Sequence, residues 1–201
     1  MVLDTLKSLS QYEVIGYLDD SGDLQAKTIN GLSVLGTISQ LKDLVSQKKI
    51  EGAIIGVGNT DMKARDAIFK KTKQIGINLI NVINPSSIIS QSCSIEEGVF
   101  IGPKAIIGPG SVMGKNGVVY AGAIIEHDNK IEDNVYISPG VILSGKVTVK
   151  KDTFIGSGAV VIPGLTLGSN VTIGAGAVVI ENIPDNVVAV GVPAKVIKTK
   201  N

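Results

Sequence analysis

The chain has 201 residues, a net charge of +1 and a hydrophobic fraction of 44%, so it can bury an aliphatic core in one large domain or two small ones. Its 19 basic and 18 acidic residues nearly balance and form no polybasic run, which argues against nucleic acid and anionic membranes as partners. No long apolar run indicates a membrane span, and the single cysteine, Cys93, fits a reducing cytoplasm.

The first 84 residues have an α/β pattern. Thr37 and Gln40 fit the two ends of a capping box at the start of a helix, and Gly76 fits a helix stop signal. Strands that alternate with helices predict a parallel sheet covered by helices. The expected strands cover 13–18, 53–57 and 78–83, and the expected helices cover 2–9, 37–49 and 61–74.

Two turns of this α/β segment are candidate ligand sites. Asp19 and Asp20 follow the first expected strand, and Gly58 and Asn59 follow the second. Ligands of parallel sheets bind at the carboxyl ends of the strands, where these turns lie. Ordinary turn chemistry explains the same residues equally well, so their position alone leaves both interpretations open.

A six-residue repeat dominates the rest of the chain. A large apolar residue recurs at every sixth position from Ile89 to Val179, sixteen times without a miss. This period does not fit a helix, but it suits a short strand followed by a turn. Three such units would close one triangular coil, with the large residue at the corner and a small residue, four positions later, on the flat wall. Stacked coils of this kind form a hexapeptide-type parallel β-helix about 25 Å long; the alternative is a generic Val/Ile-rich β domain.

The repeat divides the chain into three segments. Residues 1–84 form the α/β domain, residues 85–184 form the β-helix and residues 185–201 form a C-terminal tail. Turn-forming residues mark the two boundaries, at 84–87 and at 183–186.

The single histidine of the sequence, His127, is the strongest catalytic candidate. It lies in the triplet Glu126-His127-Asp128, which we expect on an outward-facing turn of a coil. An exposed imidazole beside a carboxylate can act as a general base near neutral pH, whereas a merely solvated turn is the alternative. One histidine cannot supply a three-histidine zinc site, so we expect no metal. Neither a G-x-S-x-G motif nor a P-loop occurs, and Cys93 is expected to be structural.

The hexads, the α/β segment, the stretch 124–128 and the ending 191–195 (Gly-Val-Pro-Ala-Lys) together resemble the hexapeptide-repeat acyltransferases. Among these, the chain looks like the PglD/NeuD group of sugar N- and O-acetyltransferases along nearly its whole length. The resemblance implies a mainly β fold, in which a small Rossmann-like α/β domain precedes a left-handed parallel β-helix. It also implies a cytoplasmic homotrimer that acts in glycan biosynthesis, with active sites at subunit boundaries.

The resemblance implies acetyl-CoA as cosubstrate and the amino group of a nucleotide-linked amino-dideoxysugar as acceptor. His127 would be the general base and Asp128 the carboxylate that orients it, while the N–H of Gly145 would meet the thioester oxygen. The other implied contacts are Tyr136, Gly145, Ser157 and Ala175 for acetyl-CoA, and Asp19, Asp20, Gly58 and Asn59 for the nucleotide-sugar.

Two further functions remain as alternatives: O-acetylation of a sugar of the sialic acid type, and a non-catalytic solenoid that serves assembly.

One departure from the group bears on substrate binding. Its members begin with a β-strand and a glycine-rich turn that holds the nucleotide, whereas this sequence begins Met1-Val2-Leu3-Asp4. We therefore expect residues 1–201 to bind a nucleotide-sugar weakly and acetyl-CoA normally.

Overall fold

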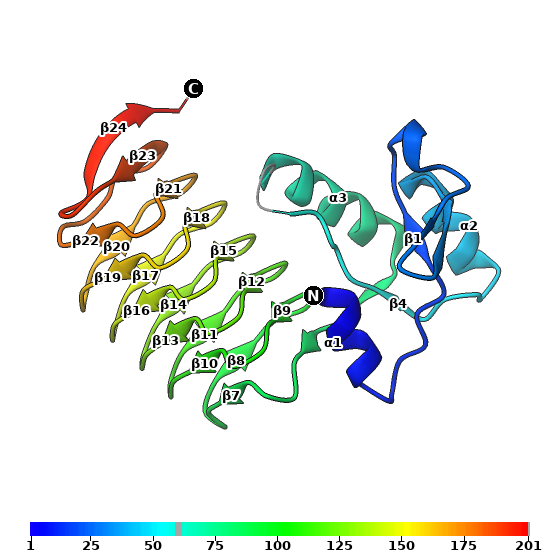
Figure 1. Ribbon diagram of the computed structural model, residues 1–201, viewed down its shortest axis with the longest axis horizontal. Helices are drawn as coiled ribbons and strands as arrows, with labels where there is room; N and C mark the ends of the chain where they lie inside the picture. The colour runs from blue at the N-terminus through cyan, green and yellow to red at the C-terminus, as the bar shows by residue number, and fades with distance from the viewer. Residues whose placement is uncertain (59–61, 201) are drawn as a thin grey trace.

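The computed structural model describes residues 1–58 and 62–200. A triangular β-helix makes up the larger part of the chain, and a smaller α/β unit precedes it (Figure 1). The α/β unit packs on one of the three walls of the β-helix through an apolar cluster that includes Leu6, Val82 and Phe100.

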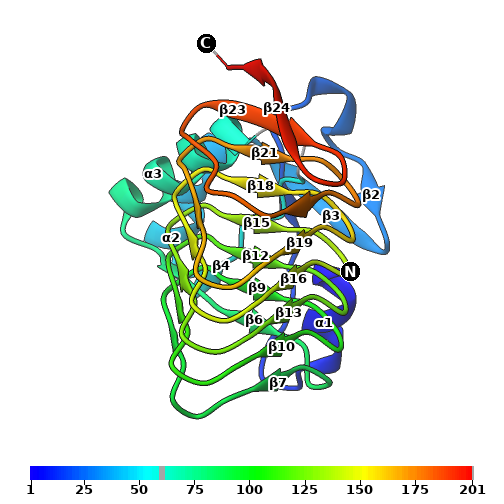
Figure 2. The ribbon, with the colours of Figure 1, turned by 90° about the vertical axis from the view of Figure 1, so that its left-hand side faces the viewer.

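The β-helix is a stack of left-handed coils in which each coil supplies one short strand to each of three parallel walls (Figure 2). Consecutive strands of one wall pair 18 residues apart, as Ile125 pairs with Leu143. The six-residue repeat is therefore a strand and a turn, as expected. Wall 1 contains β6 (Val82–Ile83), β9 (Phe100–Ile101), β12 (Val118–Val119), β15 (Tyr136–Ile137), β18 (Phe154–Ile155) and β21 (Thr172–Ile173). Wall 2 contains β7 (Ile88–Ile89), β10 (Ile106–Ile107), β13 (Ile124–Ile125), β16 (Ile142–Leu143), β19 (Val160–Val161) and β22 (Val178–Val179). Wall 3 contains β8 (Ser94–Ile95), β11 (Val112–Met113), β14 (Lys130–Ile131), β17 (Thr148–Val149) and β20 (Thr166–Leu167).

The large apolar residues of the repeat lie on the walls, so their expected place at the corners was wrong. Ile125 and Leu143 are the second residues of their strands, face inward and are 1% and 0% exposed. A two-residue turn forms each corner instead, as at 127–128 between walls 2 and 3. Asp128 has a left-handed φ of 58° in this turn, which lets the chain change direction sharply. The interior is consequently filled from the flat walls.

The first residue of each strand faces outward, and the three walls differ in what they present. On wall 1, Phe100, Val118 and Tyr136 are covered by the α/β unit. Wall 2 presents a partly exposed aliphatic column, and wall 3 presents a mixed column rich in polar side chains. The wall 2 column is Ile88, Ile106, Ile124, Ile142, Val160 and Val178, and the wall 3 column is Ser94, Val112, Lys130, Thr148 and Thr166.

The helices of the α/β unit lie close to their expected positions. Gln40 accepts a hydrogen bond from the backbone N–H of Thr37 at 2.8 Å, which confirms the capping box. The described part of the third helix begins at Met62, because the expected start at Asp61 lies outside the described residues. The helical segments are α1 (Val2–Ser8), the 3₁₀ turns η1 (Gly22–Leu24) and η2 (Ile38–Gln40), α2 (Leu41–Ser46) and α3 (Met62–Ile75).

The strands of the α/β unit form two small sheets, where the sequence predicted one. Within the described residues, β1 pairs in parallel with β3, β3 pairs antiparallel with β2, and β4 pairs in parallel with β5. β1 and β4 do not pair with each other, and residues of both sheets line one cavity. The expected strand over 78–83 is split, because β6 joins wall 1 of the β-helix. The strands are β1 (Tyr17–Leu18), β2 (Thr28–Ile29), β3 (Leu32–Gly36), β4 (Gly52–Ala53) and β5 (Asn78–Leu79).

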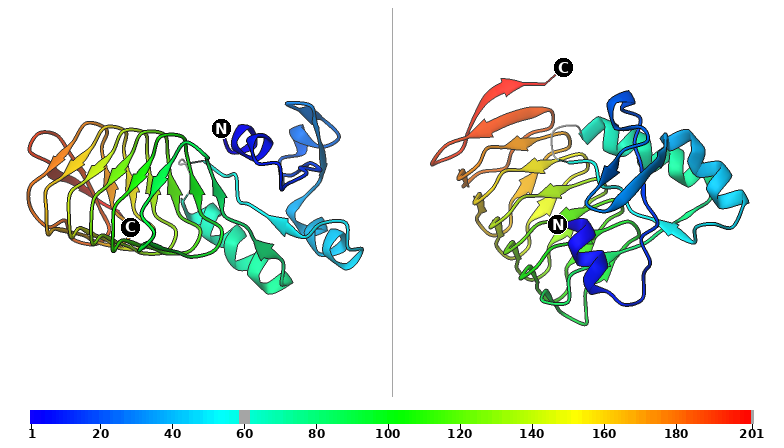
Figure 3. Two further views of the ribbon diagram at one scale, coloured as in Figure 1. Left: turned by 90° about the horizontal axis from the view of Figure 1, so that it is seen from below. Right: turned by 45° about the vertical axis from the view of Figure 1, so that its right-hand side comes forward.

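The tail extends wall 1 at the far end of the stack, where the red strands lie in Figure 3. β23 (Val187–Val190) pairs in parallel with β21, and β24 (Lys195–Thr199) turns back antiparallel to β23. These strands cover the last coil, whose apolar interior would otherwise face solvent.

The inward residues of the walls should carry most of the stability. Ile155 is fully buried, so Ile155→Ala should lower the free energy of unfolding by about 2–5 kcal/mol in urea denaturation. Thr148→Ala, on the outward face of wall 3, is the matched control and should change it by no more than about 0.5 kcal/mol. Equal losses for the two variants would contradict the inward and outward assignment.

Candidate active site

His127 and Asp128 form the two-residue turn between β13 and β14, at the corner of walls 2 and 3. Their side chains are about half exposed, at 51% and 54%. The backbone around them is tied to both neighbouring coils, since Asp128 N–H donates to Pro109 O at 2.8 Å and Lys146 N–H donates to His127 O at 2.9 Å. The turn is thus accessible to a ligand while its main chain is held in place.

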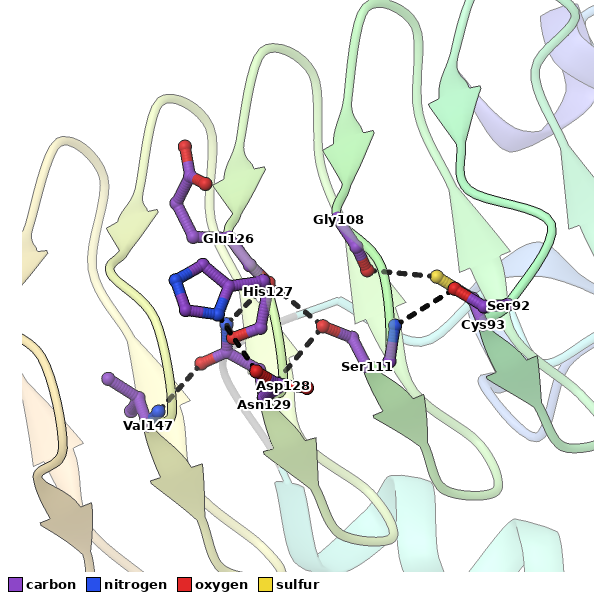
Figure 4. Close-up of polar contacts among 10 residues, drawn as sticks. Ser92, Cys93, Gly108, Ser111, Glu126, His127, Asp128, Asn129 and Val147 are labelled. Carbon is purple, nitrogen blue, oxygen red and sulfur yellow. Dashed lines mark hydrogen bonds and ion pairs between the residues drawn. The ribbon is translucent and has the colours of Figure 1, made fainter.

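The two side chains interact directly (Figure 4). His127 Nδ1 lies 2.9 Å from Asp128 Oδ2. A carboxylate can only accept at this contact, so the neutral imidazole carries its proton on Nδ1 and leaves Nε2 as a free acceptor. This is the arrangement that a general base requires. Residues 126–128 are all exposed, which confirms the outward-facing turn expected for the triplet.

Glycines lie next to both members of the pair. A methyl group at Gly145, one coil above, would overlap the imidazole ring near Nε2. A methyl group at Gly110, one coil below, would lie 2.5 Å from Asp128 Oδ1. The absence of side chains at these two positions leaves room for the imidazole and the carboxylate to adopt their observed orientation.

The structure places Gly145 at His127 but separates the other residues predicted to contact acetyl-CoA. Ser157 and Ala175 stack on each other at the corner between walls 1 and 2, one wall away from His127. Tyr136 faces outward on wall 1 and is 5% exposed beneath the α/β unit. Burial raises the pKa of its hydroxyl. Within a single chain, therefore, only Gly145 of these four residues adjoins the imidazole.

Asp19 and Asp20 border the cavity between the two sheets of the α/β unit. The cavity has a volume of about 620 Å³ and is also lined by Gly56 and Val57, which follow β4. Asp20 Oδ1 accepts the N–H of Ile38 at 2.8 Å, and Asp19 Oδ1 accepts the N–H of Ser21 at 2.8 Å. The carboxyl ends of β1 and β4 therefore meet at one cavity. Gly58 is exposed just beyond Val57, whereas Asn59 lies outside the described residues.

Sequence reasoning missed a buried arginine that joins this strand end to the β-helix. Arg65 is 2% exposed and donates from Nη1 to the carbonyls of Ile55 and Val57, at 3.2 and 3.0 Å. Its Nη2 donates to the backbone and side-chain oxygens of Asn116, at 2.9 and 2.8 Å. Burial lowers the pKa of the guanidinium to about 10. An arginine on a helix carries no sequence signal of this contact, because its partners are backbone carbonyls distant in the chain.

Two buried polar residues behind the His127 turn, Ser111 and Asn129, also escaped prediction as functional residues. They are 2% and 0% exposed. Each occupies the repeat position that follows a turn, where alanine or valine is common. A polar residue at that position, next to the histidine, was the available signal.

The described residues contain no group of three or more His, Cys, Asp or Glu side chains that could hold a metal ion. Among the helices of residues 1–58 and 62–200, none is long and apolar enough to cross a membrane.

Comparison with known families matches both units of the chain. Residues 1–72 match the PglD N-terminal domain. Residues 93–127 match the hexapeptide repeat of succinyl-transferase, and residues 146–181 match the bacterial transferase hexapeptide (six repeats). No curated protein matches the chain in sequence.

Several solved structures share the whole architecture. A histidine-to-asparagine mutant of perosamine N-acetyltransferase from Caulobacter crescentus, in complex with CoA and GDP-perosamine, is 31% identical with a TM-score of 0.91, over 98% of this chain and 90% of its own. The acetyltransferase domain of PglB from Neisseria gonorrhoeae, in complex with acetyl coenzyme A, is 34% identical with a TM-score of 0.89, over 98% and 92% of the two chains. WeeI from Acinetobacter baumannii is 25% identical with a TM-score of 0.84, over 98% and 91%.

These relatives share the α/β unit, the stacked hexads and the order in which they occur. At more than 30% identity over nearly the full length, the likeness extends beyond a shared fold. The chain therefore belongs to the PglD-type family of hexapeptide-repeat acetyltransferases, enzymes built on the left-handed β-helix.

Proposed function

We propose that this acetyltransferase moves the acetyl group of acetyl-CoA to the amino group of a nucleotide-linked amino-dideoxysugar, with His127 as general base. The hydrogen bond between His127 Nδ1 and Asp128 Oδ2 carries the proposal, because it leaves Nε2 free to take a proton. The relatives add support, since the perosamine enzyme was solved with CoA and GDP-perosamine and the PglB domain with acetyl coenzyme A.

The reaction is a direct transfer. Nε2 of His127 removes a proton from the acceptor amine, whose nitrogen attacks the thioester carbonyl carbon. A C–N bond forms, the C–S bond breaks, and the imidazolium returns its proton to the CoA sulfur, so that the ring ends neutral. Asp128 stabilises the transient imidazolium.

In this proposal, the backbone N–H of Gly145 donates a hydrogen bond to the oxyanion. Its Cα lies against the imidazole near Nε2, and its N–H donates to no group in the described part of the chain. A free backbone N–H beside the base can stabilise the developing negative charge on the thioester oxygen.

The nucleotide part of the acceptor is assigned to the cavity of the α/β unit. Asp19 and Asp20 border this cavity and Gly58 follows its rim, at the carboxyl ends of β1 and β4, where parallel sheets bind ligands. Asn59 belongs to the same proposed site by its position in the sequence.

We assign wall 2 as the contact surface of a homotrimer. Its outward column is wholly aliphatic, and Ile88 and Ile142 are 65% and 37% exposed. Such a face marks a protein interface. Wall 2 lies between the corner of His127 and the corner of Ser157 and Ala175, so packing it against other copies would bring both corners into one groove for acetyl-CoA.

Replacing the base tests the function directly. His127→Ala should lower kcat by about 100-fold or more in an assay of CoA release with nucleotide-linked amino sugars, because general base catalysis is lost. Asp128→Asn should lower kcat as well, because the amide can donate to Nδ1 and favour the wrong tautomer.

The same assay with hydroxyl acceptors distinguishes O-acetylation of a sugar from N-acetylation. Wild-type activity in His127→Ala would refute the role of His127, and inactivity of the wild type with every acceptor would favour a non-catalytic solenoid.

Gly145→Ala tests the packing beside the base. The added methyl group should push the imidazole out of place and lower kcat by about 10- to 100-fold, while the unfolding temperature changes little, because the displaced group is a half-exposed side chain. Steady-state kinetics and thermal unfolding of the same preparations separate the two effects. An unchanged kcat would show that the ring does not act from its observed position.

The trimer proposal is tested by placing charge on wall 2. The double variant Ile106→Lys with Ile142→Lys should run as a monomer of 20.8 kDa in light scattering and lose activity, because the charges would be desolvated at the interface. Its matched control, Thr148→Lys with Thr166→Lys on wall 3, should keep the mass of three chains. A trimeric wall 2 variant would contradict the assignment.

A further inference from the structure

Directly behind the His127 turn, the interior of the β-helix contains polar side chains where other coils have apolar ones. The position after each turn points inward and is usually filled by alanine or valine, as at Ala123, Val141 and Val147. Ser111 and Asn129, in successive coils at the corner of walls 2 and 3, are polar instead. Burying a polar group is unfavourable unless it is hydrogen-bonded, so the contacts of Asn129, which is 0% exposed, identify what this residue does.

Asn129 binds both its own turn and the coil above (Figure 4). Its Nδ2 donates to the carbonyl of Glu126 at 2.6 Å and lies 3.4 Å from the carbonyl of His127. Its Oδ1 accepts the N–H of Val147 at 3.0 Å. The partners fix the orientation of the amide, since carbonyls require a donor and the N–H requires an acceptor.

Ser111 completes the same network from the coil below. Its Oγ donates to Glu126 O at 2.8 Å and accepts the N–H of Asn129 at 3.1 Å. The carbonyl of Glu126 therefore accepts two hydrogen bonds from the interior. The peptide that leads into His127 is held from behind by side chains of two coils.

Thr153 shows that a buried polar side chain can bind the coil above without also binding its own turn. It follows a turn at the corner of walls 3 and 1, and it is equally buried. Its Oγ1 donates to Gly168 O at 2.7 Å and accepts the N–H of Val171 at 3.1 Å, so all of these contacts go to the next coil. Asn129 makes the same type of contact to Val147, and its longer side chain also reaches back to the turn of His127.

We propose that Asn129 is a positioning residue that holds the 126–128 turn so that Asp128 Oδ2 and His127 Nδ1 stay paired and Nε2 stays available. The proposal rests on the proposed role of His127 as base. The side chain of Asn129 is buried and bonds only to backbone groups, so it acts through the main chain of the turn.

Asn129→Ser is the informative variant. Serine at this position can accept the N–H of Val147 in the way that Ser111 accepts the N–H of Asn129, so no buried donor is left without a partner. It lacks the reach to bind the carbonyls of Glu126 and His127. The unfolding temperature should therefore stay close to the wild-type value, while kcat falls by about 10- to 100-fold with KM for acetyl-CoA unchanged. Asn129→Thr, which would reproduce the type of contact that Thr153 makes, serves as the second variant if the serine variant folds poorly.

The tautomer of His127 gives a readout that needs no substrate. The sequence has one histidine, so ¹⁵N signals of imidazole nitrogens in the protein belong to His127. In the wild type at a pH where the ring is neutral, the proton should reside on Nδ1. In Asn129→Ser the population should shift toward the Nε2–H form. The matched control Thr153→Val, which removes the buried hydroxyl at another corner, should lower stability but leave both the tautomer and kcat unchanged.

The outcomes separate this inference from the proposed function. A tautomer shift in Asn129→Ser, absent from Thr153→Val, supports the positioning role even if no acceptor sugar is acetylated. Identical spectra for Asn129→Ser and the wild type would overturn it, whatever the kinetics of His127→Ala. Equal shifts in Asn129→Ser and Thr153→Val would also overturn it, because the effect would then be a general loss of packing.

Discussion

The 18-residue register of the backbone ladder is the constraint on which the rest of the molecule depends. Each strand pairs with the strand one coil later, as Ile124 and Ile125 pair with Ile142 and Leu143. From Phe100 to Val179, each strand residue therefore lies above the residue 18 positions earlier, while the end of the stack pairs at a spacing of 16, as Leu167 does with Ile183. This rule brings Gly145 onto His127, and it places the side chain of Asn129 where it can meet the N–H of Val147. The site is assembled by stacking rather than by a loop that must be ordered separately, so its geometry shares the stability of the interior.

The same register lets the outward faces of the three walls meet three different environments. The inward residues fill a continuous aliphatic core, while each outward column is free to meet a different environment. Wall 1 carries aromatic and aliphatic side chains, such as Phe100 and Tyr136, beneath the α/β unit. Wall 2 is aliphatic and partly exposed, and wall 3 carries Lys130 and threonines on its outward face. His127 lies where the aliphatic wall meets the polar one, so a ligand at this corner can be sheltered on one side and reached from solvent on the other.

The sequence predicted the parts of the fold that depend on periodicity. Sixteen apolar residues in register specify strands and coils, and the Glu-His-Asp triplet falls at a turn by counting alone. The period does not state which residue of the unit turns the corner, so Ile125 was misplaced. Two features depend on contacts between distant segments. One is the division of the α/β unit into two sheets, and the other is the set of hydrogen bonds from Arg65 to Ile55 and Asn116. Local patterns carry no information about such contacts. A polar residue at the position after a turn did mark Asn129, but its partners are backbone groups, which every residue possesses, so the sequence did not show what it binds.

A crystal structure of the protein with bound acetyl-CoA is the most direct test of the central claim, which is that His127 is the general base for attack on the thioester. The account predicts the thioester carbonyl on the Nε2 side of His127, with its oxygen facing the N–H of Gly145 and Asp128 still paired with Nδ1. A thioester bound along wall 3 or in the α/β cavity, remote from that corner, would contradict it.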